Sequence, residues 1–172
     1  MRYGLPVIGF VGPSSSGKTT LLEGLVRTLE EQDLSVGVVK HSCHDVSADQ
    51  PGKDSARLYA AGAEAVALAG QNQIATFVRR EMPPRLGDAL LSLPAGLDVV
   101  LVEGFAWEQI PRYLVLPEGF TDTSRYTEHG PILGTLVPKG EPLFPPEVIA
   151  ELAGEIADLI GRPTLSDSAE FQ

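Results

Sequence analysis

One stretch of nine residues has the residue types and the spacing that phosphate binding needs. Residues 12–20 read GPSSSGKTT, which fills every fixed position of the motif G-x-x-x-x-G-K-[S/T]. In such a loop backbone N–H groups point at phosphate oxygens, the lysine adds charge for the β- and γ-phosphates, and the last hydroxyl is a ligand for Mg²⁺. We therefore expect a nucleoside triphosphate to be bound by Gly12, Ser14, Ser15, Ser16, Gly17, Lys18, Thr19 and Thr20.

The segments on both sides of this loop are the ones that the motif requires. Residues 5–11 form an apolar run of the length of a buried strand. Residues 20–30 repeat leucine and valine at helical spacing, which predicts a helix with one apolar stripe. The start of that helix would face the bound anion. A chance Gly/Ser-rich turn is the alternative, and both flanks argue against it.

A second candidate for the same site is the acidic end of a later strand. Residues 98–103 read DVVLVE, four apolar residues between two acids. In phosphate-loop NTPases a carboxylate near the end of such a strand lies close to Mg²⁺. Glu103 is the candidate, together with Thr19, because Asp98 lies at the opposite end of the strand, about 17 Å away at the usual rise per residue. The alternative is that Glu103 is an acid facing solvent.

A polar segment, residues 41–53, follows a second expected strand over residues 35–40. A strand, a helix and a strand form a βαβ unit, so we expect a parallel sheet with a right-handed crossover and this segment at the same edge as the phosphate loop. It could contact a second ligand or a partner, or it could be an ordinary solvated loop. With one cysteine, Cys43, a zinc site is weakly supported. The candidate contacts are His41, His44, Asp45, Asp49, Lys53, Asp54 and Arg57.

The remaining segments complete an α/β pattern. Residues 65–69 and 73–78 are expected to pair as a hairpin. We therefore predict a three-layer fold of the P-loop NTPase type, with a mainly parallel sheet and an antiparallel hairpin insertion. Residues 1–161 are predicted to form a single nucleotide-binding domain, followed by a flexible tail over residues 162–172. The other expected elements are helices over residues 54–61, 86–93 and 146–160 and strands over residues 113–116 and 132–137.

Composition narrows the class of protein. The chain has 172 residues, 43% of them hydrophobic, and a formal net charge of −10, which suits one globular domain. An acidic chain without a Lys/Arg cluster argues against nucleic acid and membrane surfaces as partners. No apolar run has the length of a membrane span, no leader pattern is evident, and the single cysteine fits a reducing compartment, so we expect a cytoplasmic protein.

Four passages resemble the family of molybdopterin-guanine dinucleotide biosynthesis protein MobB, over about the first two-thirds of the chain. They are residues 12–20, VKHSCHD at 39–45, DQPGKDSAR at 49–57 with AGA at 61–63, and LVEGF at 101–105. The resemblance implies a dimer that binds GTP with Mg²⁺, hydrolyses it slowly and assists the guanylyltransferase that attaches GMP to molybdopterin. On this chain it implies triphosphate binding by residues 12–20, a metal at Thr19 and Glu103, and a nucleotide or pterin partner near residues 41–57.

Two other functions stay open at this stage. A P-loop small-molecule kinase usually has an arginine-rich lid, and the cluster Arg79, Arg80 and Arg85 does not have that pattern. A nucleotide-dependent interaction module without hydrolysis is the other alternative. No residue is an evident base for the attacking water; Asp45, Asp49 and Glu103 are candidates among which the sequence does not choose, so the catalytic residue is left unknown. The sequence PKG at 138–140 replaces the N-K-x-D of GTPases, so the preference for GTP over ATP rests on the resemblance.

Overall fold

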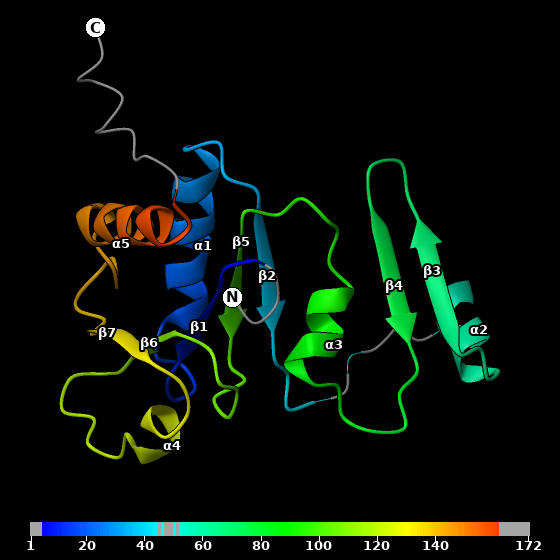
Figure 1. Cartoon of the computed structure of the whole chain (residues 1–172). Coiled ribbons are helices and arrows are strands. Elements are labelled where there is room, and N and C mark those ends of the chain that lie inside the picture. The colour runs from blue at the N-terminus through cyan, green and yellow to red at the C-terminus, as the bar shows by residue number, and fades with distance from the viewer. Residues whose placement is uncertain (1–4, 45, 47–49, 51, 162–172) are drawn as a thin grey trace, which may run out of the picture. The chain divides into compact units, whose positions relative to one another are not determined.

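The main sheet of the protein is parallel, with the strand order β2-β5-β1-β6-β7. It is seen in a computed structural model that describes residues 5–44, 46, 50 and 52–161 (Figure 1). The first strand lies at the centre, and β5 lies between it and β2, so the first two strands are parallel without being neighbours. The strands are β1 (Val7–Val11), β2 (Val36–Lys40), β5 (Val99–Glu103), β6 (Arg112–Val115) and β7 (Ile132–Leu136).

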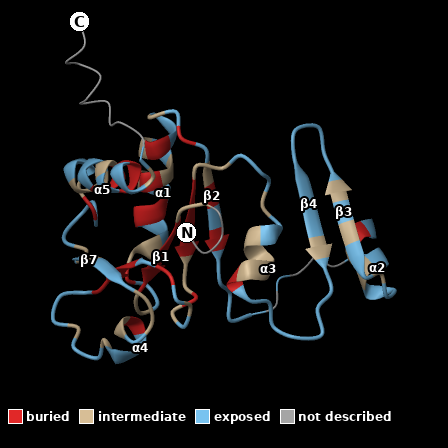
Figure 2. Ribbon diagram, viewed as in Figure 1, coloured by how far each residue is buried: buried red, intermediate tan, exposed pale blue. Residues whose placement is uncertain are grey.

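Apolar side chains cover both faces of this sheet. Ile8 and Phe10 of β1 pack on one face with the leucines of α1 (Lys18–Glu30) and the apolar stripe of α5 (Pro146–Leu159). The opposite face packs against α3 (Leu86–Leu91) and, farther along, against Tyr126 of α4 (Ser124–Thr127). Buried residues therefore follow the central strands and the inner faces of the helices (Figure 2). A strand buried on both faces reads as a continuous apolar run, as β1 does.

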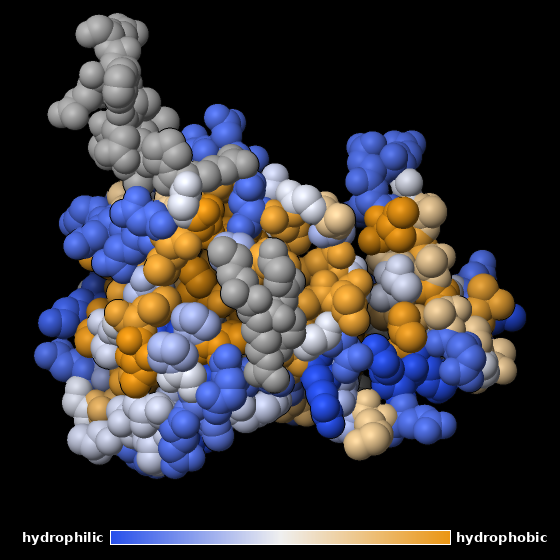
Figure 3. All heavy atoms as spheres, viewed as in Figure 1, coloured by the Kyte–Doolittle hydropathy of each residue, from blue (hydrophilic) through white to orange (hydrophobic). Residues whose placement is uncertain are grey.

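Residues 42–85 form a second compact unit, which is described by itself. It contains α2 (Asp54–Ala60) and an antiparallel hairpin of β3 (Ala65–Ala69) and β4 (Ile74–Val78). Hydrophobic atoms lie at the surface of this unit (Figure 3). Two large apolar side chains of the hairpin lie in solvent, because Ile74 is 75% exposed and Val78 is 56% exposed. Ser55 is the buried side chain among the described residues of this unit. A hairpin without a core of its own is marginally stable.

The predicted three-layer fold, the mainly parallel sheet and the antiparallel hairpin are confirmed. The short helix α4 was not expected, because four residues are too few for a periodic apolar pattern. The single domain over residues 1–161 stays a prediction, and the tail at 162–172 lies outside the described residues. In the described part of the chain, no helix has the length and apolar character of a membrane span.

Candidate nucleotide-binding site

The phosphate loop connects β1 to α1, and its first glycine lies against the neighbouring strand β6. A Cβ atom built on Gly12 would be 3.0 Å from the carbonyl carbon of Val115 and would overlap the carbonyl oxygen. That oxygen belongs to the backbone inside the sheet, so it cannot turn away as the end of a side chain could. A glycine at position 12 is therefore what allows the loop to lie this close to the sheet.

The second glycine of the motif leads the chain into the helix. Gly17 is the N-cap of α1 and has φ 83°, a left-handed conformation that favours glycine. Within the described structure no side chain caps this helix end and its first turn has no acid. The N–H groups of that turn can thus face an anion. A cavity of about 280 Å³ opens here, lined by Ser15, Ser16, Gly17, Lys18, Thr19, Thr20, Glu103 and Leu143.

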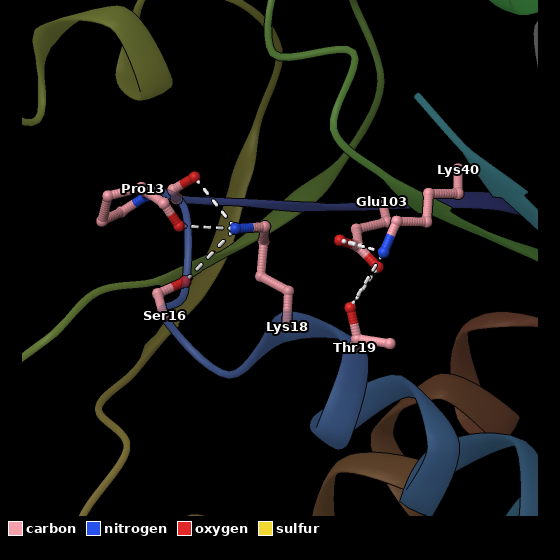
Figure 4. A network of polar contacts seen from close by, with 7 residues as sticks. Pro13, Ser16, Lys18, Thr19, Lys40 and Glu103 are labelled. Atoms are coloured by element: carbon pink, nitrogen blue, oxygen red, sulfur yellow. Dashed lines mark hydrogen bonds and ion pairs between the residues drawn. The ribbon is translucent and has the colours of Figure 1, made fainter. Parts of the chain in front are cut away.

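The ammonium group of Lys18 is folded back onto its own loop (Figure 4). It donates to the carbonyl oxygens of Pro13 at 2.6 Å and Gly12 at 3.1 Å, and to Ser16 Oγ at 3.4 Å. Burial lowers the pKa of Lys18 below the ordinary lysine value; Glu103 opposes this shift and Lys40 adds to it. A phosphate group at this place would replace the three oxygen partners and would favour the charged form of the lysine.

Thr19 and Glu103 meet as expected for residues that attend one metal ion. Thr19 Oγ1 donates a hydrogen bond to Glu103 Oε2 at 2.9 Å (Figure 4). The Lys40 ammonium lies beside both, 3.1 Å from Thr19 Oγ1 and 3.1 Å from Glu103 Oε1. The three residues come together because α1 starts at this edge and because β2 and β5 pair with Lys40 opposite Glu103.

The donor set at this point fits Mg²⁺. A hydroxyl and a carboxylate are hard oxygen ligands, which Mg²⁺ prefers, and its remaining positions are usually taken by water and phosphate oxygens. The Lys40 ammonium, a cationic group, already lies against the hydroxyl oxygen of Thr19 and a carboxylate oxygen of Glu103. Asp98 plays no part here, because its Oδ2 accepts the Ser35 N–H at 2.8 Å at the opposite end of β5. The metal role of Thr19 and Glu103 remains a prediction that this geometry supports.

An aromatic cluster continues the same edge beyond Glu103. The His41 backbone N–H donates to the Glu103 carbonyl oxygen at 2.9 Å. The His41 ring makes edge contacts with Phe105 and Trp107, each with ring centroids 5.0 Å apart. Phe105 is buried, whereas Trp107 is 53% exposed. The end of β5 is thus followed by a cluster of aromatic rings next to the candidate metal ligands, and within it the Trp107 ring is the half-exposed one.

The loop that carries these rings is fastened by a buried arginine. Arg112, at the start of β6, is fully buried and donates to the carbonyl oxygens of Ala106 at 2.5 Å, Ile110 at 3.3 Å and Glu108. Burial lowers the pKa of Arg112, and the nearby Glu108 opposes that shift. Three carbonyl groups of the turn after β5 therefore share one cation, which holds the turn in a single arrangement.

The expected second-ligand segment is divided by the structure. His41 lies in the main unit beside Glu103, while the described candidates farther along belong to the unit of residues 42–85. There Arg57 forms an exposed ion pair with Asp54 at 3.2 Å, and the carbonyl oxygen of Lys53 accepts the Arg57 N–H. The His44 N–H donates to Ser42 Oγ. Asp45 and Asp49 lie outside the described residues, so a second-ligand role for this segment stays a prediction.

Two further observations concern the alternatives. No group of three or more His, Cys, Asp or Glu side chains suited to a metal occurs among the described residues. Arg79, from the arginine cluster weighed as a kinase lid, donates to the Tyr59 carbonyl oxygen at 2.6 Å and lies 4.4 Å from the centroid of the Tyr59 ring. These contacts tie Arg79 to its own unit, which gives the kinase hypothesis no support.

Sequence reasoning missed Lys40, Leu143 and Arg112 as residues that shape this site. Lys40 was read as the end of a strand, and no pattern in the sequence says that this strand pairs with the one ending at Glu103. Leu143 reaches the cavity from a loop after β7, which is far away in sequence. A charged residue directly before an apolar run was a weak signal for Arg112, because such residues are mostly exposed.

Comparison with known proteins gives consistent matches. The family model of molybdopterin guanine dinucleotide synthesis protein B matches residues 7–137. The molybdopterin-guanine dinucleotide biosynthesis adapter protein of Haemophilus influenzae is 40% identical over 116 residues, which is 67% of this chain and 65% of that protein. The adapter protein of Escherichia coli is 35% identical over 67% of each chain. The crystal structure of Bacillus subtilis MobB superposes with a TM-score of 0.64 at 28% identity, covering 80% of this chain and 82% of the other.

Proposed function

Because the chain belongs to the family of molybdopterin guanine dinucleotide synthesis protein B, we propose that it is a GTP-binding adapter with weak GTPase activity. In this proposal it assists the attachment of GMP to molybdopterin, which forms the guanine dinucleotide form of the molybdenum cofactor. The observation that carries it is the contact between Thr19 of the phosphate loop and Glu103 of β5, both of which line the cavity. The chain spans just under two thirds of the Haemophilus relative, and the adapter role is therefore inferred.

Each part of the loop has a task in this proposal. The N–H groups at the start of α1 and the Lys18 ammonium bind the β- and γ-phosphates. Thr19 and Glu103 hold Mg²⁺, which neutralises phosphate charge when it is bound. Leu143 lines the cavity with an apolar wall. Binding of GTP, and the preference for guanine, rest on the family, since the N-K-x-D sequence is absent after β7.

We expect slow hydrolysis because of what the acid at the site would contact. With Mg²⁺ bound, the Glu103 carboxylate would be engaged with the metal and with the Thr19 hydroxyl, which already donates to it in the nucleotide-free protein. A general base must have a free acceptor within hydrogen-bond reach of the attacking water. An acid with these contacts acts as a metal ligand and as a hydrogen-bond acceptor from a hydroxyl, and it is poorly suited to act as the general base for a water molecule. A nucleotide-dependent adapter needs binding and release more than it needs turnover.

The partners in this proposal are the molybdenum cofactor guanylyltransferase, the complex that carries molybdopterin, and a second copy of this chain. Exposed apolar side chains of the unit 42–85 support a protein partner; Leu58 is 61%, Ile74 is 75% and Val78 is 56% exposed. A described unit with one buried side chain, Ser55, gains stability from covering that surface. We propose that a homodimer uses it.

Calorimetric titration of the protein with GTP and with ATP, with and without Mg²⁺, tests the nucleotide part of the proposal. We expect GTP to bind more tightly than ATP, to require Mg²⁺ and to be hydrolysed very slowly. Lys18→Ala should remove tight binding of both nucleotides, because it removes the phosphate-facing charge. A GTP affinity of Lys18→Ala equal to that of the wild type would contradict the phosphate-loop assignment. Rapid phosphoryl transfer from the nucleotide to an added metabolite would favour a kinase instead.

A further inference from the structure

Lys40 places a cation on the two oxygen atoms that a metal would need. Its ammonium nitrogen lies 3.1 Å from Thr19 Oγ1 and 3.1 Å from Glu103 Oε1, and Thr19 in turn donates to Glu103 Oε2 (Figure 4). The Glu103 side chain is only 13% exposed, whereas that of Lys40 is 56% exposed. A carboxylate so far removed from water needs a positive partner, and Lys40 supplies it.

We propose that the Lys40 ammonium holds the metal position in the nucleotide-free protein and that Mg²⁺ enters with the triphosphate by displacing it. This inference rests on the proposed function, because it assumes that Thr19 and Glu103 are the metal ligands. It adds a role for a residue outside the phosphate loop. In this role Lys40 lowers the affinity of the site for Mg²⁺ alone and makes metal entry depend on nucleotide entry.

The two cations cannot share these oxygens. Mg²⁺ requires oxygen ligands at about 2.0–2.1 Å in near-octahedral geometry, and an ammonium group beside the same two oxygens would lie within a few ångströms of it. At such a distance like charges repel, and because the Lys40 side chain is partly exposed, solvent screens this repulsion to the strength of one surface charge pair. Thr19 Oγ1 has two lone pairs, and the Lys40 N–H uses one of them. Charge repulsion, and not a shortage of lone pairs, is therefore what keeps the ammonium group and a metal ion from sharing Thr19 and Glu103.

The nucleotide gives the displaced ammonium a new partner. Lys40 is the last residue of β2, at the edge where the phosphate loop, Glu103 and the start of α1 meet. A triphosphate brings several negative charges to that edge, so the lysine can exchange a carboxylate for a phosphate while the metal takes the carboxylate. Without nucleotide, Mg²⁺ would leave the ammonium with no anion of comparable strength among the contacts described for it.

The direct test is metal binding to the nucleotide-free protein. Mn²⁺ alone is used as a probe that shares the preference of Mg²⁺ for oxygen ligands, and free Mn²⁺ is counted by electron paramagnetic resonance. Lys40→Met removes the charge and keeps most of the side-chain length, so it should bind Mn²⁺ about two- to fivefold more tightly than the wild type, the range of one partly exposed charge pair. Lys40→Arg keeps the charge and should stay close to the wild type.

Arg27→Met is the matched control for overall charge. Arg27 is an exposed residue of the same helix as Thr19, roughly 12 Å along its axis at 1.5 Å per residue. The Arg27→Met substitution changes the net charge by the same amount as Lys40→Met and leaves the site unchanged. We expect the Mn²⁺ affinity of this variant to equal that of the wild type. If Arg27→Met gains affinity as Lys40→Met does, a general field is responsible and the proposal fails. Equal or weaker Mn²⁺ binding by Lys40→Met would also overturn it.

A Mg²⁺ titration at a fixed concentration of fluorescent GTP separates this inference from the proposed function. Lys40→Met should reach half-maximal nucleotide binding at about a two- to fivefold lower Mg²⁺ concentration, again the strength of one partly exposed charge pair. An unshifted midpoint in a variant that binds GTP would contradict the displacement of Lys40. If the wild type binds no GTP at any Mg²⁺ concentration, the proposed function fails, and the Mn²⁺ comparison still decides the role of Lys40.

Discussion

A single methyl group at Gly12 should disable nucleotide binding. The Cβ atom of Gly12→Ala would overlap the Val115 carbonyl oxygen and lie 3.0 Å from its carbon and 3.2 Å from Ser16 Oγ. An ordinary contact between carbon and oxygen is about 3.3 Å or longer, so the loop has to move by roughly 1 Å. A misplacement of that size costs on the order of 100-fold where geometry decides. Overpacking adds about 1–3 kcal/mol of destabilisation.

The matched control is a second glycine-to-alanine change in the neighbouring helix. Gly24→Ala puts its Cβ atom 2.5 Å from Ile149 Cδ1, the far end of a flexible side chain that can turn aside. Alanine also favours a helix by about 0.8–1 kcal/mol over glycine. Calorimetric GTP titrations should therefore show lost affinity for Gly12→Ala and wild-type affinity for Gly24→Ala. Urea unfolding measures the change in the free energy of unfolding of each variant. A Gly12→Ala affinity within threefold of the wild type would refute the reasoning about close approach to β6.

Three further changes test other parts of the site. Glu103→Ala should raise the Mg²⁺ concentration needed for GTP binding by on the order of 10–100-fold, a larger factor than its effect on GTP affinity at saturating Mg²⁺. An unaltered Mg²⁺ titration would contradict the assignment of Glu103 as a metal ligand. Burial lowers the pKa of Lys18, so GTP affinity should fall as pH rises through that lowered value, and constant affinity up to pH values near the ordinary lysine pKa of about 10.4 would contradict this. Over the same pH interval the nucleotide-free protein should gain stability, because the unfolded chain then binds more protons. Arg112→Met leaves three loop carbonyls without their donor and should lower the free energy of unfolding by about 2–4 kcal/mol, measured by urea unfolding.

Local rules explain why the phosphate loop could be read from the sequence. A strand, the loop and the following helix are contiguous, and each is specified by short-range patterns of glycine and apolar residues. Glu103 was found for a related reason, because an acid after four apolar residues marks the end of a buried strand. The hairpin of β3 and β4 was predicted from two adjacent runs with a polar turn between them.

Long-range pairing explains what the sequence could not give. Lys40 and Glu103 are 63 positions apart, and they meet only because β2 and β5 are neighbours in register. Strand order is a property of the whole sheet. The βαβ pattern predicts that β1 and β2 are parallel, but it does not predict that β5 lies between them. Arg112 was missed because arginine is rarely buried, and its role appears only when the carbonyl groups of residues 106–110 surround it.

The strand order also explains why a lysine stands at position 40. Neighbouring strands lie about 4.8 Å apart, so the end of β5 is one strand spacing from the end of β1, and the end of β2 is two spacings away. A side chain that starts on β2 must pass Glu103 to reach Thr19 at the start of α1, and the four-carbon stem of lysine has that reach. A shorter residue at position 40 would leave the Glu103 carboxylate without its cation and the Thr19 hydroxyl without its donor. The length of Lys40, as much as its charge, is therefore what joins the second strand to the nucleotide site.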